Sequence, residues 1–352
     1  MYEVSGRKSG WRRILSASLV SPQDIADRLG IGSSMIEPVT ARYPARINPY
    51  YLSLIESKGD SLWRQAVPDP AELKDRVFKE SDPLSEAGQS PVAGLIHRYP
   101  DRVLFMVSDK CAMYCRYCMR KRIVGGGKGA GDVDIGKGLD YISRTPRVRE
   151  VILSGGDPLM ADDAGLDKLL SRISRIEHVE VIRIHTRMPC TLPFRITSDL
   201  VRILGAHAPL YVNIQFNHPD ELTDEAKKAC AMLADAGIPL GCQTVLLAGV
   251  NDDIKTMTAL MTGLLAARIR PYYIHHPDPV QGTAHFTVPL KKGLEIMDAL
   301  RGNISGMGVP NYMIDLPGGG GKVPLLPQYV LERTEEKLVV RNFENQIFEY
   351  QI

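Results

Sequence analysis

The sequence predicts an α/β protein built on a parallel sheet, because two patterns alternate along it after residue 100. Six short apolar segments have the length and composition of buried strands, and helix-like segments lie between them. Strands that alternate with helices form parallel sheets. Six units are fewer than the eight of a closed (β/α)8 barrel, which leaves an incomplete barrel or an open sheet. The strands are expected at 103–107, 151–153, 179–184, 210–216, 238–247 and 269–274.

The helices of this alternation carry ordinary start and stop signals. Thr223 and the two acids after it open one helix, and Gly237 closes it. The helices are expected at about 135–144, 163–176, 198–206, 223–236 and 252–267.

Three regions are predicted along the chain. Residues 1–100 lack a strong strand pattern and are expected to form a helical layer followed by an extended arm, with a helix start at Ser21 and Pro22. Residues 101–320 contain the alternating strands and helices. Residues 321–352 are expected to add a strand and hairpin, near 338–343, that covers an edge of the sheet.

Composition limits the classes of function. The chain has 352 residues, 44% of them hydrophobic and 24% charged, which is ordinary for a globular enzyme. Its net charge of +2 gives no reason to expect nucleic acid or an anionic membrane as a partner. No apolar run approaches the roughly 20 residues of a membrane span, the first residues lack a secretory signal, and the cysteines are clustered. We therefore expect a cytoplasmic protein.

Polar residues follow five of the six expected strands. The carboxyl ends of parallel strands meet at one edge of a sheet, so these loops are expected to converge on one active face. The five loop starts are Cys111–Cys118, Ser154–Pro158, His185–Arg187, Asn217–Pro219 and His275–Asp278.

Half of the six cysteines lie within eight residues. Cys111, Cys115 and Cys118 form a CxxxCxxC motif. Three thiolates can hold one metal centre and leave one coordination position open. A structural zinc site usually takes four ligands in two separated pairs, and no second pair follows here. An iron–sulfur cluster with one open iron is the interpretation we favour.

This motif, on the loop after a first strand, resembles the radical S-adenosylmethionine superfamily. The superfamily also has a Gly-Gly-Glu-Pro-like segment that binds the methionine amino group of S-adenosylmethionine. Ser154, Gly155, Gly156 and Asp157 match that segment, with aspartate in place of glutamate. Two glycines after a strand allow a close approach of backbone to a ligand.

A second unusual segment, Asp315–Lys322, contains four consecutive glycines and ends in a lysine. It is not a Walker phosphate loop, which needs glycine where Leu316 stands and serine or threonine where Val323 stands. A flexible linker would be longer and rich in serine. A lysine beside a crowded ligand suggests a Schiff base with a carbonyl cofactor, pyridoxal phosphate above all.

The two segments together make the chain resemble the lysine 2,3-aminomutase family from about Trp11 onward. The other matching segments are 49–55, 97–102, 216–219, 270–273, 317–322 and 341–343. The resemblance implies a partial (β/α)6 TIM-like barrel with a helical N-terminal layer and a short C-terminal extension. It implies a [4Fe-4S] cluster on the three cysteines, S-adenosylmethionine on the open iron, an external electron donor and a deoxyadenosyl radical. The implied reaction interconverts L-lysine and β-lysine.

The resemblance also implies roles for single residues. Lys322 matches the lysine that carries pyridoxal phosphate, and Arg120 matches the arginine that pairs with the substrate carboxylate. Asp278 and Asp315 match the two acids that hold the distal ammonium of lysine. Two buried carboxylates repel each other unless a cation joins them. A cationic substrate such as lysine is therefore favoured. Glutamate is disfavoured, because its distal carboxylate would need basic or neutral groups at these positions. The residues expected around the cofactor phosphate are Arg98, Tyr99, Arg102 and Gln243.

The chain departs from the family pattern at three places. The last cysteine is Cys242, whereas relatives carry a C-terminal cysteine cluster for a zinc that bridges subunits. Gln215 stands in place of a histidine, and His275–Pro277 differs before Asp278. The sequence leaves undecided whether the protein forms a homo-oligomer. The alternatives in function are a mutase for arginine or ornithine, an enzyme that supplies β-lysine for a translation elongation factor, and a zinc-bound protein without catalysis.

Overall fold

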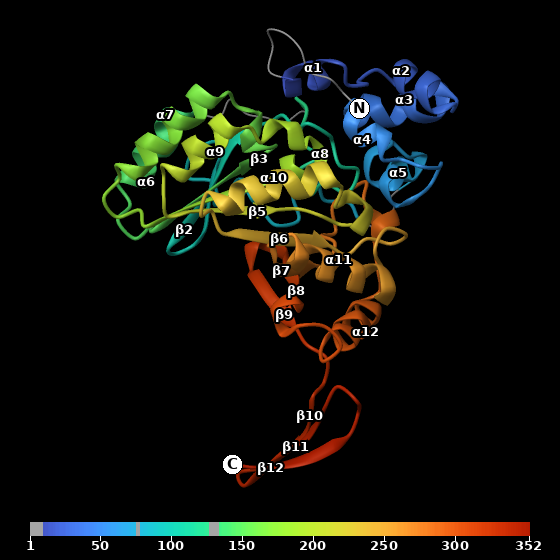
Figure 1. Cartoon of the computed structure of the whole chain (residues 1–352), viewed down its shortest axis with the longest axis vertical. Helices are drawn as coiled ribbons and strands as arrows, with labels where there is room; N and C mark the ends of the chain where they lie inside the picture. The colour runs from blue at the N-terminus through green and yellow to red at the C-terminus, as the bar shows by residue number, and fades with distance from the viewer. Residues whose placement is uncertain (1–9, 75–77, 127–133) are drawn as a thin grey trace.

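The computed structural model describes residues 10–74, 78–126 and 134–352, and its main body is a nine-stranded sheet curved into an incomplete barrel (Figure 1). The strands lie side by side in chain order. Strands β2 to β8 are parallel, whereas β1 and β9 pair antiparallel at the two edges. The strands are β1 Leu95–Tyr99, β2 Arg102–Ser108, β3 Glu150–Gly155, β4 Val181–Thr186, β5 Leu210–Ile214, β6 Leu240–Val245, β7 Arg270–His275, β8 Asn311–Leu316 and β9 Gly321–Leu325.

Helices cover the outside of the barrel and complete the predicted partial (β/α)6 arrangement (Figure 1). Within the described ranges, one long α-helix lies between each pair of successive parallel strands, and a short one, α8 Met188–Thr191, is added between β4 and β5. Among the described residues, no helix is both long and apolar enough to cross a membrane. The long helices are α6 Ile135–Ser143, α7 Asp163–Ser174, α9 Ser198–Gly205, α10 Asp224–Asp235, α11 Ile254–Ala266 and α12 Leu290–Leu300.

A layer of short helices precedes the barrel, as the sequence predicts. The Ser21 side chain accepts a hydrogen bond from the backbone N–H of Asp24, and Gly30 ends the helix with a φ of 64°. This confirms the predicted helix start. The helices of this layer are α1 Gly10–Ser16, α2 Pro22–Leu29, α3 Ser33–Arg42, α4 Pro49–Ser53 and α5 Ser61–Ala66.

The alternation of side chains along a strand separates the core from the barrel interior. In β4, Ile182 and Ile184 are buried in the main hydrophobic core, whereas Arg183 and His185 line a cavity inside the barrel. Because side chains alternate between the two faces of a strand, the polar pair and the apolar pair point in opposite directions. The interior of the barrel is therefore polar enough to bind a charged ligand.

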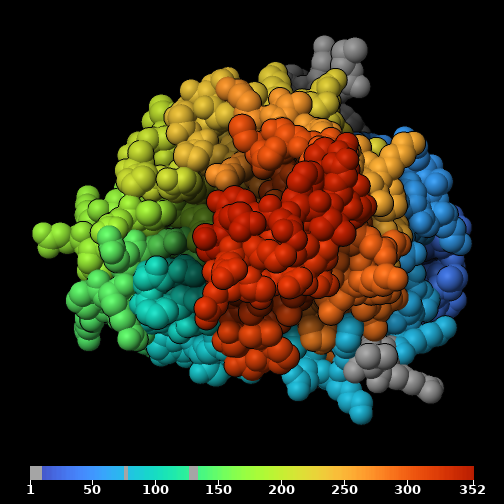
Figure 2. Space-filling model, turned by 90° about the horizontal axis from the view of Figure 1, so that it is seen from below, coloured from blue at the N-terminus to red at the C-terminus, as the bar shows by residue number. Residues whose placement is uncertain are grey.

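The C-terminal residues form a separate sheet. Strands β10 Val330–Arg333, β11 Lys337–Arg341 and β12 Ile347–Gln351 pair with one another, and in the described chain they pair with no strand of the barrel. Figure 1 shows this sheet projecting from the barrel, and Figure 2 looks at the molecule along that projection. The strand expected near 338–343 exists as β11, but the expectation that it covers an edge of the main sheet is wrong.

Candidate active site

One cavity of about 470 Å³ inside the barrel is lined by every residue that the sequence singled out for a site role. These residues come from β1, β2, β3, β6, β8 and β9 and from the loops after β2, β3 and β7. The fold therefore brings together positions more than two hundred residues apart, such as Arg98 and Lys322. The shared residues are Arg98, Tyr99, Arg102, Cys111, Cys115, Cys118, Arg120, Ser154, Gly155, Gly156, Asp157, Gln243, Asp278, Asp315 and Lys322.

The cysteine loop after β2 is held in place by a buried ion-pair network. Arg116, within the motif, donates through Nε and Nη2 to the two carboxylate oxygens of Glu72, at 2.9 and 2.7 Å. Lys121 Nζ donates to the same carboxylate at 2.7 Å. Burial alone would raise the pKa of Glu72, but Arg116 and Lys121 lower it below its usual value. The N-terminal region therefore fixes the shape of the loop.

The segment after β3 lies directly against this loop. The N–H of Gly156 donates to the Ser108 carbonyl at 2.6 Å, and the N–H of Asp157 donates to the Lys110 carbonyl at 2.7 Å. A Cβ atom at Gly156 would overlap the Lys110 carbonyl, and Gly155 has a φ of 120°. Glycine is therefore required at both positions by close packing and by backbone conformation.

Asp157 itself is occupied by protein partners. Its carboxylate accepts hydrogen bonds from Thr186 Oγ1 and from the backbone N–H of Arg187, both at 2.8 Å, and from the N–H of Leu159 at 3.0 Å. Burial raises its pKa. These bonds fix the segment 154–157 beside the cysteines, and its binding of a methionine amino group stays a prediction.

The three thiols border the cavity and are free of disulfides. Burial raises the pKa of Cys111 well above its usual value and that of Cys118 to about 11. Arg187 Nη1 donates to Cys115 Sγ at 3.1 Å, and the backbone N–H of Arg120 donates to Cys118 Sγ at 3.3 Å. In the described part of the chain, no three metal-ligating side chains already stand in a metal-binding arrangement. Three free thiols on one preformed loop, two of them bonded by N–H groups, nevertheless fit an iron–sulfur cluster.

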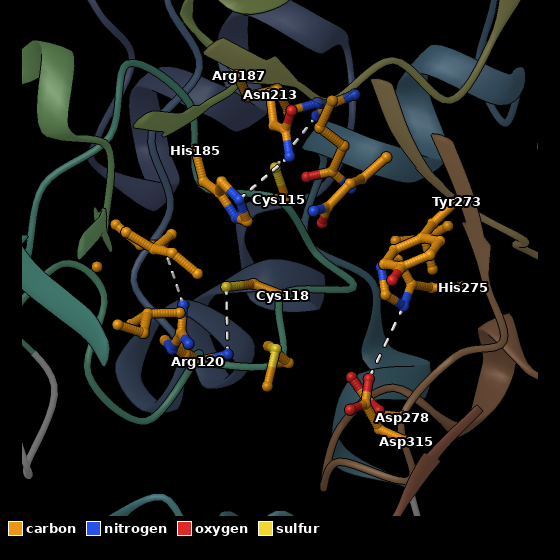
Figure 3. Close-up of a pocket in the computed structure, with 18 of the residues that line it drawn as sticks. Cys115, Cys118, Arg120, His185, Arg187, Asn213, Tyr273, His275, Asp278 and Asp315 are labelled. Atoms are coloured by element: carbon orange, nitrogen blue, oxygen red, sulfur yellow. Dashed lines mark hydrogen bonds and ion pairs between the residues drawn. The ribbon is translucent and has the colours of Figure 1, made fainter. Parts of the chain in front are cut away.

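Two acids lie together at the other side of the cavity (Figure 3). In the antiparallel pair β8–β9, Asp315 lies opposite Lys322, and Lys322 Nζ donates to Asp315 Oδ2. Arg98 Nη1 is 3.6 Å from Asp315 Oδ1, and His275 Nδ1 is 3.8 Å from Oδ2. Burial and the neighbouring charge of Asp315 raise the pKa of Asp278 to about 7. This side of the cavity therefore favours a positively charged group.

Arg120 lies apart from this acidic pair in Figure 3, beside Cys118. Its guanidinium forms an ion pair with buried Glu86, with 2.6 Å between Nη2 and Oε1. Nη1 of Arg120 is 3.4 Å from the Ser154 hydroxyl. The cavity therefore has a basic group at one side and an acidic pair at the other.

The expected surroundings of a cofactor phosphate are only partly gathered. Tyr99 Oη accepts a hydrogen bond from the backbone N–H of Lys322 at 3.0 Å, and the guanidinium of Arg102 lies 4.0 Å from the centre of the Tyr99 ring. Arg98 donates to the Gln89 side chain at 2.7 Å. Gln243 lines the cavity from β6, on another side of the barrel.

The glycine run is a tight turn. Gly318, Gly319 and Gly321 have positive φ angles, and a Cβ atom at Gly319 would overlap the Gln89 side chain. The N–H of Gly318 donates to the carbonyl of Pro83 at 2.9 Å. The run therefore packs against the N-terminal arm and is not a flexible linker.

Several polar residues in the cavity wall, or directly behind it, were given no individual site role by the sequence. Arg187 donates to the Gln65 side chain at 2.7 Å and also to Glu221, and all three are buried. Glu86 is the other unpredicted acid. Burial lowers the pKa of His185 well below its usual value, so this imidazole is neutral. Arg187 belongs to the loop start at His185, and Glu221 follows the loop start at Asn217, so the sequence pointed to both regions. Gln65 and Glu86 lie in segments without a chemical motif.

Two protein-family models match the chain. The model described as the radical SAM superfamily matches residues 105–261, and the one described as lysine-2,3-aminomutase matches residues 297–352. Together they include the cysteine loop, the segment after β3 and the glycine turn.

Curated relatives align over most of the chain. The L-lysine 2,3-aminomutase of Acetoanaerobium sticklandii is 50% identical over 307 residues, which are 86% of this chain and 74% of the relative. The L-lysine 2,3-aminomutase of Bacillus subtilis is 45% identical over 88% of this chain and 67% of the relative. The glutamate 2,3-aminomutase of Clostridioides difficile is 41% identical over 89% of this chain and 74% of the relative. Among solved structures, Streptococcus suis SuiB bound to S-adenosylmethionine aligns with a TM-score of 0.46 at 13% identity, over 61% of this chain and 51% of that chain.

Proposed function

Because the chain belongs to the lysine 2,3-aminomutase family within the radical S-adenosylmethionine superfamily, we propose that it interconverts L-lysine and β-lysine. The family makes it a 2,3-aminomutase-type isomerase that uses S-adenosylmethionine and an iron–sulfur cluster. The choice of lysine as substrate and of pyridoxal phosphate as a further cofactor are our proposals.

The observation that carries the choice of substrate is the acidic pair Asp278 and Asp315. Asp315 is 4% exposed at its side chain and already binds the Nζ of Lys322, an ammonium group identical to the distal group of lysine. A distal carboxylate, as in glutamate, would add a third negative charge there. A cation at this place would also stabilise the ionised form of Asp278. Lysine therefore fits this end of the cavity, and glutamate does not.

The opposite end fits the substrate carboxylate. Arg120 presents a planar fork that matches a carboxylate, and the Ser154 hydroxyl lies beside it. An amino acid bound between Arg120 and the acidic pair is held at both ends, which places the carbon atoms between them in a fixed position. Such positioning lowers the entropic cost of the reaction.

Lys322 fits as the residue that holds pyridoxal phosphate. Its Nζ faces the cavity from β9, and Arg98, Tyr99 and Arg102 lie close by with cationic and hydroxyl groups suited to a phosphate. When bound, pyridoxal phosphate supplies a carbonyl for the substrate amine and a π-system that stabilises an unpaired electron. The three cysteines would hold the cluster, which would supply the electron for the cleavage of S-adenosylmethionine.

The test is turnover by anaerobically reconstituted protein. Reduced enzyme with S-adenosylmethionine and pyridoxal phosphate is incubated with L-lysine, L-arginine, L-ornithine or L-glutamate, and β-amino acids are measured by chromatography. We expect β-lysine as the main product. Faster conversion of arginine or ornithine would replace lysine with that substrate. A colourless protein that contains zinc and takes up no iron would refute the radical chemistry altogether.

A further inference from the structure

Glu86 is a buried acid beside the predicted carboxylate site. Its side chain is 4% exposed and pairs with Arg120. We propose that Glu86 is a positioning residue that determines which edge of the Arg120 guanidinium faces the amino-acid substrate. This inference rests on the proposed function, because it concerns how the substrate carboxylate is bound.

The contacts show which edge of Arg120 is taken. Nε lies 3.2 and 3.1 Å from the two carboxylate oxygens of Glu86, and Nη2 donates to Oε1 at 2.6 Å. Glu86 thus binds the side edge of the guanidinium, formed by Nε and Nη2. A guanidinium has five N–H donors, so the end edge, formed by Nη1 and Nη2, keeps donors for a second carboxylate. Nη1 lies 3.4 Å from the Ser154 hydroxyl, in the wall of the cavity.

Glu86 is itself held firmly. Its backbone N–H donates to Asp82 Oδ1 at 3.0 Å, and the Ser90 hydroxyl donates to its carbonyl at 2.7 Å. Arg122 Nη2 lies 3.3 Å from Glu86 Oε2 and 3.2 Å from Asp82 Oδ1. Burial alone would raise the pKa of Glu86, but Arg120 and Arg122 lower it to about 2. Glu86 is therefore a fixed anion at any working pH.

A fixed anion is useful here because the cavity contains competing acids. Asp278 lines the same cavity as Arg120. Without Glu86, the long and flexible arginine side chain would be drawn toward Asp278 and would occupy the place of the substrate ammonium. Glu86 keeps the basic and acidic ends of the cavity apart, and it removes the entropic cost of orienting Arg120 when substrate binds.

The test compares two ligands that differ only in the carboxylate. Unreduced protein loaded with pyridoxal phosphate is titrated with L-lysine and with cadaverine, which is lysine without its carboxylate, while the absorption of the bound cofactor is followed. For Glu86→Gln we expect the Kd of lysine to rise about tenfold or more, as for the loss of one charge-assisted contact. The Kd of cadaverine should stay within about twofold of wild type.

Two further variants separate positioning from a structural role. Asp82→Asn weakens the same segment without touching Arg120, so it should leave the ratio of the two Kd values unchanged. In an Arg120→Gln background, Glu86→Gln should not change that ratio further, because both substitutions act through one guanidinium. Glu86→Asp keeps the charge and should recover part of the preference for lysine.

An unchanged ratio of the two Kd values in Glu86→Gln would overturn the inference, whether both ligands bind more weakly by the same factor or neither is affected. Additive effects of the two substitutions would also overturn it, because Glu86 would then act independently of Arg120. If wild-type protein binds neither ligand, the proposed function fails instead, and the two failures are therefore distinguishable. A Glu86→Gln protein that does not fold would leave Glu86→Asp and the Asp82→Asn control to decide the outcome.

Discussion

Replacing Asp278 with asparagine should weaken the use of lysine strongly. The pKa of Asp278 is about 7 without a ligand, against an ordinary value of 3.8. A substrate ammonium that restored the ordinary value would gain about 4 kcal/mol from this carboxylate, which sets the upper limit. Asparagine keeps a neutral acceptor for a hydrogen bond, so we expect a loss of about 2–4 kcal/mol. That loss corresponds to a fall of about 30- to 1,000-fold in kcat/KM for lysine.

The dependence on pH follows from the same carboxylate. Below pH 7 free Asp278 is increasingly protonated, whereas the ε-ammonium of lysine stays charged. In wild-type enzyme, kcat/KM for lysine should therefore fall as the pH decreases below about 7, and Asp278→Asn should lack this decrease.

The assay is the initial rate of β-amino-acid formation between pH 6 and 9, with L-norleucine as a control because it lacks the ε-ammonium. Asp278→Asn should leave the rate with norleucine and the content of pyridoxal phosphate and iron close to wild type. Unchanged lysine kinetics in the variant would refute the assignment of Asp278 to the ammonium site. An equal loss with norleucine would show a structural effect instead.

Three other substitutions give separate tests. Lys322→Ala should lose the absorption band of bound pyridoxal phosphate at unchanged iron content, and a variant that keeps the band would exclude Lys322 as its attachment site. Glu72→Gln leaves Arg116 and Lys121 without their buried anion, so it should lower stability by about 3–5 kcal/mol and reduce iron uptake, measured by thermal unfolding and iron analysis. Wild-type values of both would show that the network does not hold the loop. Arg187→Leu removes an N–H donor from Cys115, which should make the midpoint potential of the cluster more negative in an EPR-monitored titration, and an unchanged potential would contradict this.

The sequence predicts the regular part of the fold well. All six expected strands and all five expected helices exist, because their apolar runs and caps are local signals. Four elements of the barrel lack such signals. In β9, Pro324 and the preceding glycines argue against a strand. The other three, β1, β8 and α12, lie outside the run of six predicted units.

The site could be predicted only where residues of one motif stand close in sequence. The cysteine loop and the glycine turn are such motifs, and the family resemblance supplied Arg120 and Asp278. Glu72 and Glu86 could not be found in this way, because their partners lie 34 to 49 residues further along the chain. A buried acid is recognised only when the fold shows which cations surround it.

The ion pairs that Glu72 forms with Arg116 and Lys121 should make folding of the cysteine loop independent of metal binding. In many small metal sites the ligands come together only when the metal binds, so the metal contributes directly to folding. Here Arg116, Lys121 and Glu72 shape the cysteine loop with the protein's own charges. The apoprotein should therefore keep its fold after chelation and accept a cluster repeatedly. Glu72, which comes from the N-terminal region, would thus keep the cysteine loop ready to take up a cluster.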